Sequence, residues 1–296
     1  MTIQFPTAAP AATVILTRPA EAGIEVYLLK RSATSSFMAG NYVFPGGMVD
    51  DVDAGDWSDL VDMDHETIKR RLGGGLAVQD ALTYGVAAIR ETFEEAGVLL
   101  ARQTDSATQG FERARRQRET DVFKEGWFRS LVTEHQFCLQ LTGLFRWAHW
   151  VTPREMKRHY DTRFFVAAMP PDQTCRPDAR ETTAGVWISP LAGLKANLKG
   201  EISLSPPAIV TLQAFSKFKD YEELQEVITK RPWGEPLRPR FITMGKDAVI
   251  VEPWDPEFEQ SGIDIDRAKL GDKLLPVASD FSRIWLHGGV WRPVEV

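Results

Sequence analysis

The sequence predicts an α+β fold in which a mixed β-sheet packs against helices. Two β-rich runs come first, at residues 11–18 and 24–31. A helical pattern over residues 78–95 follows them, and strand-like runs return between residues 143 and 189. A second helical stretch then covers residues 207–230. Strands and helices therefore occur in groups without regular βαβ alternation, which is typical of α+β proteins.

Local composition sets the boundaries of the first elements. Residues 19–23, Pro-Ala-Glu-Ala-Gly, favour a turn, so the two β-rich runs are predicted to form a hairpin. The run 42–47, Tyr-Val-Phe-Pro-Gly-Gly, predicts a third short strand that the proline and glycines end. Gly97 lies just after the helical pattern of residues 78–95, where a C-cap glycine is expected.

Composition and charge exclude several classes of protein. The net charge of −6 argues against a protein that coats nucleic acid, so no nucleic-acid partner is expected. The basic run 113–118 lies in a stretch, 111–136, that predicts one helix or two broken near Gly126, and we interpret it as a solvated helix face. Two cysteines form neither a disulfide framework nor a zinc pattern. With no apolar run of about 18 residues and no signal-like N-terminus, a cytoplasmic protein without membrane association is expected.

Three glutamates in the helical pattern are candidates for chemistry. Glu91, Glu94 and Glu95 have the spacing that places side chains on one helix face. Carboxylates crowded in this way repel one another unless a cation lies among them, and hard oxygen ligands suit Mg²⁺ or Mn²⁺. Arg90 can reach Glu94 one turn away and hold it in place. The alternative interpretation of the three glutamates is a solvated, salt-bridged helix face.

The glycine turn and the glutamate helix together resemble the signature of the Nudix hydrolases. Phe-Pro-Gly-Gly stands at residues 44–47, and Arg-Glu-Thr-Phe-Glu-Glu-Ala-Gly-Val stands at residues 90–98. Two departures from the family pattern exist. The two halves are separated by an insert at about residues 48–77 that the family usually lacks. In addition, Leu82 stands where the family carries a further glutamate, and Asp80 is the nearest carboxylate that could substitute for it.

The resemblance extends to a subgroup of this family, the peroxisomal coenzyme A diphosphohydrolases. That subgroup also carries a long insert, and it shares the runs at residues 37–47, 89–100, 150–153 and 161–165. The resemblance implies a Nudix fold over residues 10–230, with a mixed sheet between helices and a helical insert. Residues 231–296 are expected to form a small β-rich extension of unknown role.

The resemblance also implies an enzyme that hydrolyses a diphosphate linkage in a nucleoside diphosphate derivative, first of all coenzyme A or acyl-coenzyme A. It assigns Mg²⁺ or Mn²⁺ to Glu91, Glu94 and Glu95, with Glu91 as a ligand or as the base that deprotonates water. Catalysis would then rest on Glu91, Glu94 and Arg90, with Arg90 orienting the carboxylates. Phosphate binding is assigned to Gly46, Gly47 and Arg31, and Glu181 is a further candidate acid whose alternative is a solvated loop residue.

Several alternatives stay open at the level of sequence. The substrate could instead be ADP-ribose or a dinucleotide such as NADH, or the chain could be a nucleotide sensor without turnover. Self-association into a homodimer is also left open. His149 and the aromatic residues around it are interpreted as core, with stacking on adenine as the alternative for the aromatics; these aromatics are Trp147, Trp150, Phe164 and Phe165. Asp50, Asp51 and Asp53 are interpreted as an acidic surface loop, and a second cation site is the alternative.

Overall fold

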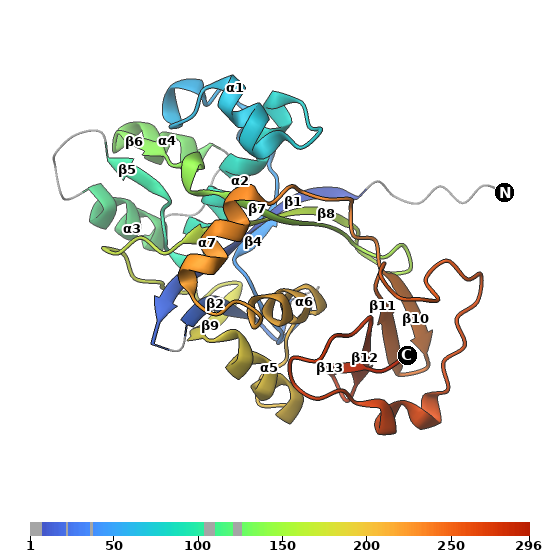
Figure 1. Ribbon diagram of the computed structural model, residues 1–296. Coiled ribbons are helices and arrows are strands. Elements are labelled where there is room, and N and C mark those ends of the chain that lie inside the picture. Colours follow the sequence, from blue (N-terminus) through green and yellow to red (C-terminus); the bar gives the residue numbers. More distant parts are fainter. Residues whose placement is uncertain (1–7, 22, 36–37, 104–109, 121–125) are drawn as a thin grey trace.

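A seven-stranded sheet forms the centre of the molecule (Figure 1). The computed structural model describes residues 8–21, 23–35, 38–103, 110–120 and 126–296. The sheet runs in the order β3-β2-β1-β8-β7, with β4 also pairing with β1 and β9 with β2. Its strands are β1 (Ala9–Ala20), β2 (Gly23–Arg31), β3 (Tyr42–Val43), β4 (Gly46–Met48), β7 (Phe145–Val151), β8 (Tyr160–Ala168) and β9 (Thr182–Ile188). Because β1 and β8 are parallel and the other pairs are antiparallel, the sheet is mixed, as predicted.

Helices cover both faces of this sheet (Figure 1). Alternate side chains of β1 point to opposite faces: Val14 and Leu16 pack into the core under α2, whereas Ile15 packs into the core on the other side. The first face carries α2 (Val78–Ala96), α3 (Gly110–Thr120) and α4 (Trp127–Glu134), and the second carries α5 (Pro190–Lys199), α6 (Pro206–Phe215) and α7 (Tyr221–Lys230). Among the described residues, no helix has the length and apolar character needed to cross a membrane.

The helix α2 positions the glutamates. It spans nineteen residues, and its buried face includes the small side chains of Ala81, Ala87 and Ala88, which let the helix lie close to the sheet. Gly97 follows it with φ +70°, and its N–H donates to the Phe93 carbonyl. Glycine takes this left-handed conformation without the penalty of a Cβ, so the predicted C-cap is confirmed.

The insert between the two halves of the signature is built from short helical turns, as predicted. These are η1 (Asp51–Ala54), η2 (Ser58–Leu60), α1 (His65–Ile68) and η3 (Lys69–Gly73). The Asp64 side chain caps α1 by accepting a hydrogen bond from the Thr67 N–H. Trp57, Ile68 and Leu72 are almost fully buried against α2 and its neighbours, so the insert is part of the main core.

Some boundaries differ from the sequence predictions. The stretch 207–230 is two helices, because the chain leaves α6 at Phe215 and Asp220 caps a new helix, accepting from the Glu223 N–H. Helix α5 was not predicted, although the Ser189 cap and the proline after it are the usual signals of a helix start. Gly126, in the left-handed conformation, precedes α4 as the predicted break suggested. Residues 121–125 of that stretch and Phe37 lie outside the described residues.

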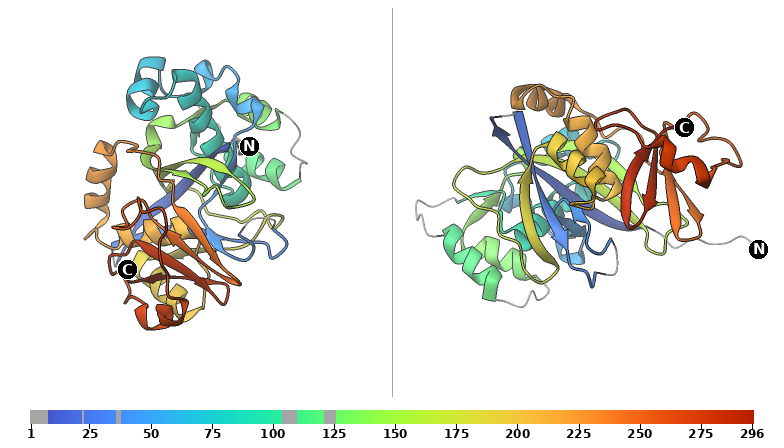
Figure 2. Two further views of the ribbon diagram at one scale, coloured as in Figure 1. Left: turned by 90° about the vertical axis from the view of Figure 1, so that its right-hand side faces the viewer. Right: turned by 90° about the horizontal axis from the view of Figure 1, so that it is seen from below.

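The extension after residue 230 forms its own four-stranded antiparallel sheet. The strands are β10 (Arg240–Met244), β11 (Asp247–Val251), β12 (Arg283–His287) and β13 (Val290–Val294), in that order. This sheet lies beside α5 and α6, at the opposite end of the molecule from α3 (Figure 2). Ala248, Ile250 and Ile284 join the core under α6, and Asn197 of α5 donates to the Trp291 carbonyl. The predicted β-rich extension is therefore packed onto the main fold.

Two short strands, β5 (Ala101–Gln103) and β6 (Phe137–Leu139), pair separately, and further 3-10 turns are η4 (Leu141–Gly143) and η5 (Arg267–Lys273).

Candidate active site

A cavity of about 770 Å³ lies beside the C-terminal half of α2. The two halves of the signature meet in its wall: Gly46 and Gly47 come from β4, and the glutamates come from α2. Other parts of the wall are formed by residues of β7, of β8 and of the C-terminal extension. The lining of this cavity includes Arg31, Gly46, Gly47, Glu91, Glu94, Glu95, Trp150, Arg158, Phe164, Glu181 and Glu252.

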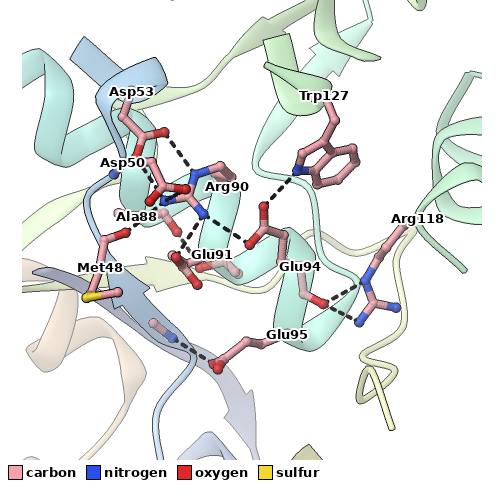
Figure 3. Close-up of polar contacts among 12 residues, drawn as sticks. Met48, Asp50, Asp53, Ala88, Arg90, Glu91, Glu94, Glu95, Arg118 and Trp127 are labelled. Atoms are coloured by element: carbon pink, nitrogen blue, oxygen red, sulfur yellow. Dashed lines mark hydrogen bonds and ion pairs between the residues drawn. The ribbon is translucent and has the colours of Figure 1, made fainter. Parts of the chain in front are cut away.

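Arg90 is the centre of a buried ionic network (Figure 3). Its Nε and Nη2 donate to the two carboxylate oxygens of Asp53 at 2.9 and 2.8 Å. Its Nη1 donates to Glu91 at 2.8 Å and to Glu94 at 3.0 Å, and Nη2 also donates to the Met48 carbonyl at 2.8 Å. One guanidinium thus ties the insert, β4 and two glutamates of α2 into a single geometry.

Asp53 is the carboxylate that the sequence analysis did not recognise. It lies on η1 of the insert and is completely buried, so its assignment to an acidic surface loop is wrong. It also accepts a hydrogen bond from the Asp50 N–H at 2.8 Å, which fixes the turn that carries it. Asp80, by contrast, is exposed in the first turn of α2 and does not line the cavity. The suggestion that Asp80 replaces the missing signature glutamate is therefore corrected: Asp53 is the acid that holds Arg90.

The two glycines of β4 let glutamates approach the backbone. The Gly46 N–H donates to Glu95 Oε2 at 2.9 Å. A Cβ added at Gly47 would lie 2.5 Å from the Glu91 carboxyl carbon, and one added at Gly46 would lie 2.5 Å from the Ala12 carbonyl oxygen. Only glycine leaves room at both positions. The glycine pair therefore positions two of the three carboxylates: Gly47 leaves space for Glu91, and the Gly46 N–H binds Glu95.

Glu94 is fixed by two residues that the sequence analysis missed as parts of the site. Trp127, at the start of α4, donates its indole N–H to Glu94 Oε1 at 3.0 Å. Arg118 donates to the Glu94 backbone carbonyl through Nε at 2.9 Å and through Nη2 at 2.7 Å (Figure 3). Because Arg118 is 4% exposed, the interpretation of the basic run 113–118 as a solvated helix face is wrong for Arg118. No local pattern in the sequence indicates a role for Trp127 at this site.

Burial raises the pKa values of the three glutamates of α2. Burial, and next the charge of Glu94, raise the pKa of Glu91 to about 8, although Arg90 opposes the shift. Burial also raises the pKa of Glu94, and burial together with the charge of Glu91 raises the pKa of Glu95 well above its ordinary value. Burial opposes the charged form of Arg90, but its carboxylate partners more than compensate and raise its pKa. The site therefore favours an added cation.

The chemistry of these donors fits a hard divalent cation. Among the residues with described positions, no three His, Cys, Asp or Glu side chains stand in a ready metal-ligand arrangement. Glu91 and Glu94 accept hydrogen bonds from Arg90, and Glu95 accepts one from the Gly46 N–H. The available ligands are carboxylate oxygens on one helix face, and the single guanidinium of Arg90 pairs with three acids, Asp53, Glu91 and Glu94, while Glu95 has no ion pair with it. Oxygen donors with excess negative charge are what Mg²⁺ and Mn²⁺ select.

The remaining candidates divide between cavity and core. Arg31 and Glu181 both line the cavity, and their charges act on the pKa of Glu95 in opposite directions, Arg31 lowering it and Glu181 raising it. Trp150 and Phe164 also face the cavity. The other two aromatics are core residues, since Trp147 packs edge-on against Phe215 and Phe165 packs against Trp233. His149 is buried, with its Nε2 2.6 Å from Asp161 Oδ1.

Replacing Gly47 with alanine is expected to reduce activity strongly while the fold is kept. The new methyl group would overlap the Glu91 carboxyl and displace it, but the Gly47 backbone conformation is one that alanine can adopt. We expect kcat to fall about a hundredfold, which is the usual cost of displacing a catalytic group by about 1 Å. Gly262→Ala, where the added carbon meets open space, is the matched control. Equal rates for the two variants would contradict the seating of Glu91 by Gly47.

The fold and this site together define the class of protein as a Nudix hydrolase. The family model described as the NUDT19 Nudix domain matches residues 67–215, half of the chain. The chain therefore belongs to the NUDT19 Nudix-domain family of pyrophosphatases.

Relatives and a solved structure agree with this assignment. The chain is 27% identical to "Acyl-coenzyme A diphosphatase NUDT19" of Xenopus laevis, over 87% of this chain and 73% of the relative. It is 26% identical to the Homo sapiens protein of the same name, over 89% of this chain and 75% of the relative. The crystal structure of a Nudix hydrolase from Alicyclobacillus acidocaldarius superposes with a TM-score of 0.60 at 24% identity, over 76% of this chain and 99% of that one. This structural likeness confirms the Nudix fold.

Proposed function

We propose that this enzyme hydrolyses the diphosphate linkage of coenzyme A or acyl-coenzyme A and that it requires Mg²⁺ or Mn²⁺. The observation that carries the proposal is the single cavity that joins the glutamates and the glycine turn to a wall of mixed polar and apolar residues. A diphosphate at the glutamates would leave the two long arms of such a substrate to extend along this wall. The names of the relatives, acyl-coenzyme A diphosphatases, support the same substrate class.

The residues of the chain divide the work of hydrolysis between them. Arg31 and the exposed Arg158, both of which line the cavity, supply positive charge for the phosphates. Glu91 is assigned to the metal together with Glu94 and Glu95, and the alternative role for it is the base that accepts a proton from the attacking water molecule. Arg90 holds Glu91 and Glu94 in register. Glu181, on the rim of the same cavity, is a second candidate for proton transfer.

Glu91, Glu94 and Glu95 would hold the metal. When bound, a divalent cation neutralises diphosphate charge and lowers the pKa of a coordinated water molecule. Burial is the main cause that raises the pKa values of the three carboxylates, and a bound cation would stabilise their charged forms, which supports the assignment. We assign catalysis to the Nudix domain at residues 10–230 and treat residues 231–296 as an extension that completes the cavity wall.

The test is a hydrolysis panel with the purified chain and Mg²⁺ or Mn²⁺, using coenzyme A, acyl-coenzyme A, ADP-ribose and NADH. Products are separated by chromatography, so that cleavage at the diphosphate is distinguished from loss of a terminal phosphate. We expect the largest kcat/KM for coenzyme A or its acyl derivatives and no turnover when the metal is chelated. A clear preference for ADP-ribose or NADH would overturn the proposed substrate, and undiminished turnover in chelator would overturn the metal requirement.

Metal binding is expected to strengthen as the pH rises toward 8 and to release protons. In the metal-free protein the pKa of Glu91 is about 8, so this carboxyl is mostly protonated at pH 6 and must lose its proton to bind a cation. Calorimetric titration with Mn²⁺ at pH 6 and pH 8, in buffers of different ionisation enthalpy, measures both the affinity and the protons released. We expect binding about tenfold or more tighter at pH 8. Affinity that does not change between these pH values would contradict the assignment of Glu91 as a ligand.

A further inference from the structure

The C-terminal extension places one unusual carboxyl group on the cavity. Glu252 directly follows β11 and lines the cavity together with Ile250 of that strand. It is completely buried, and both of its carboxyl oxygens lack a hydrogen-bond partner among the described residues. A buried polar group without a partner costs stability, so such groups are rare in proteins.

The strand pattern makes the choice of glutamate here stand out. Ala248 and Ile250 alternate along β11 and pack into the core shared with α6. Two residues further on, the same alternation would place an apolar side chain at position 252. Burial raises the pKa of Glu252 to about 8, and no neighbouring charge offsets this effect. The fold alone therefore gives no reason for a carboxyl group at this position.

Neighbouring acids show that the extension pairs its other buried charges. Arg283 donates to Asp255 through Nε at 2.9 Å and to Glu257 through Nη2 at 2.6 Å. Glu252, only three residues before Asp255, takes no part in this network. A second polar group of the cavity wall is in the same condition: the indole N–H of Trp150 is buried, without a partner among the described residues. Among the described residues, four of the seven buried side-chain atoms without a hydrogen-bond partner belong to residues that line this cavity: both oxygens of Glu252, Trp150 Nε1 and Arg31 Nε.

We propose that Glu252 is a specificity residue, whose carboxyl group accepts a hydrogen bond from an N–H group of the bound substrate. The inference rests on the proposed function, because coenzyme A offers such donors at two places, the amides of its pantetheine arm and the amino group of its adenine. The pantetheine amides and the adenine ring each have a hydrogen-bond acceptor close to the N–H donor. The indole N–H of Trp150 could donate to this acceptor. A satisfied buried hydrogen bond in the complex would replace the unsatisfied group of the free enzyme.

If Glu252 is a specificity residue, its removal should stabilise the fold and weaken substrate binding. If its role were structural, its removal should destabilise the fold and leave substrate binding unchanged. Glu252→Leu removes an unsatisfied buried carboxyl, so we expect Tm to rise by a few degrees. The same change removes the acceptor, so we expect KM for coenzyme A to rise about tenfold, with kcat much less affected. Glu252→Gln keeps an acceptor oxygen and is expected to stay within about threefold of the wild-type KM. Glu259→Gln, at an exposed position of the same extension, is the matched control for both measurements.

The two sources of the N–H donor are separated with the hydrolysis products. Competitive inhibition of the wild type and of Glu252→Leu is measured with 4′-phosphopantetheine, which carries the amides, and with 3′,5′-ADP, which carries the adenine. Weakened inhibition by the first product alone assigns Glu252 to the amides, and weakened inhibition by the second alone assigns it to adenine. A Glu252→Leu variant with lowered Tm and wild-type KM would overturn the inference in favour of a structural role.

Failure of the inference is distinguishable from failure of the proposed function. A wild-type enzyme that does not hydrolyse coenzyme A overturns the proposed function, and KM of the variants is then measured with the diphosphate that the wild type does hydrolyse. Wild-type turnover of coenzyme A with unchanged KM in both Glu252 variants overturns only the role of Glu252.

Discussion

Replacing Glu95 with glutamine is expected to lower kcat for diphosphate hydrolysis about a thousandfold. The glutamine oxygen can still accept the hydrogen bond from the Gly46 N–H, so the seat on β4 and the fold should be kept. What is lost is the negative charge of a carboxylate that is 5% exposed and that we assign to the metal. A thousandfold loss corresponds to about 4 kcal/mol of transition-state stabilisation, a magnitude that a metal at the reacting phosphate can supply.

The measurement is kcat in saturating Mg²⁺, accompanied by calorimetric titration with Mn²⁺ and by a thermal melt. Glu66→Gln, the same change at an exposed position of α1, is the control and should retain full activity. Glu94→Gln is expected to behave like Glu95→Gln, although it also disturbs the bonds to Arg90 and Trp127. If both site variants keep wild-type rates with normal melting, the metal assignment on α2 is wrong.

Replacing Asp53 with alanine is expected to lower the free energy of unfolding by about 3–5 kcal/mol, the usual cost of removing one partner from a buried ion pair. Arg90 is 3% exposed and would lose two hydrogen bonds to Asp53 while remaining buried. The turn of η1 would also lose the bond from the Asp50 N–H. Because Arg90 orients Glu91 and Glu94, the folded fraction of this variant is expected to be much less active as well.

Denaturant unfolding measures the effect, and Asp51→Ala is the control because Asp51 is exposed on the same 3-10 turn. Surface substitutions of that kind usually change stability by less than about 0.5 kcal/mol. Asp53→Asn is a useful third variant, because it keeps one acceptor for Arg90 and removes the charge. Its free energy of unfolding should lie between those of Asp53→Ala and Asp51→Ala. Equal stability of the Asp53→Ala and Asp51→Ala variants would show that the insert does not anchor Arg90.

The importance of Asp53 changes how the insert is understood. An insert within a signature could lie entirely on the surface. Here Trp57, Ile68 and Leu72 pack the insert into the main core, and Asp53 of the insert accepts a hydrogen bond from Arg90 at the candidate active site. The missing glutamate at Leu82 is explained in the same way. Leu82 is 1% exposed in the core of α2, and the acid that pairs with Arg90 comes from the insert instead.

The sequence by itself determined which glutamates share one helix face. The i, i+3 and i+4 spacing on a single helix was enough to place Glu91, Glu94 and Glu95 on one face, because helix geometry is local. The α+β class, the first hairpin, the C-cap at Gly97 and the helical character of the insert also follow from local patterns. The seat that Gly47 provides for Glu91 belongs to the same signature, although only the structure shows the contact.

The tertiary structure decided which distant residues complete the site. Asp53, Arg118 and Trp127 reach α2 from separate elements, and no local periodicity indicates that a buried aspartate, a buried arginine and an indole will converge on it. Glu252 is a further case, since it looks like an ordinary glutamate in sequence and lies on the cavity only because the second sheet packs beside α6. Contacts between residues far apart in the chain depend on how the sheets and helices pack, and packing is a property of the whole fold.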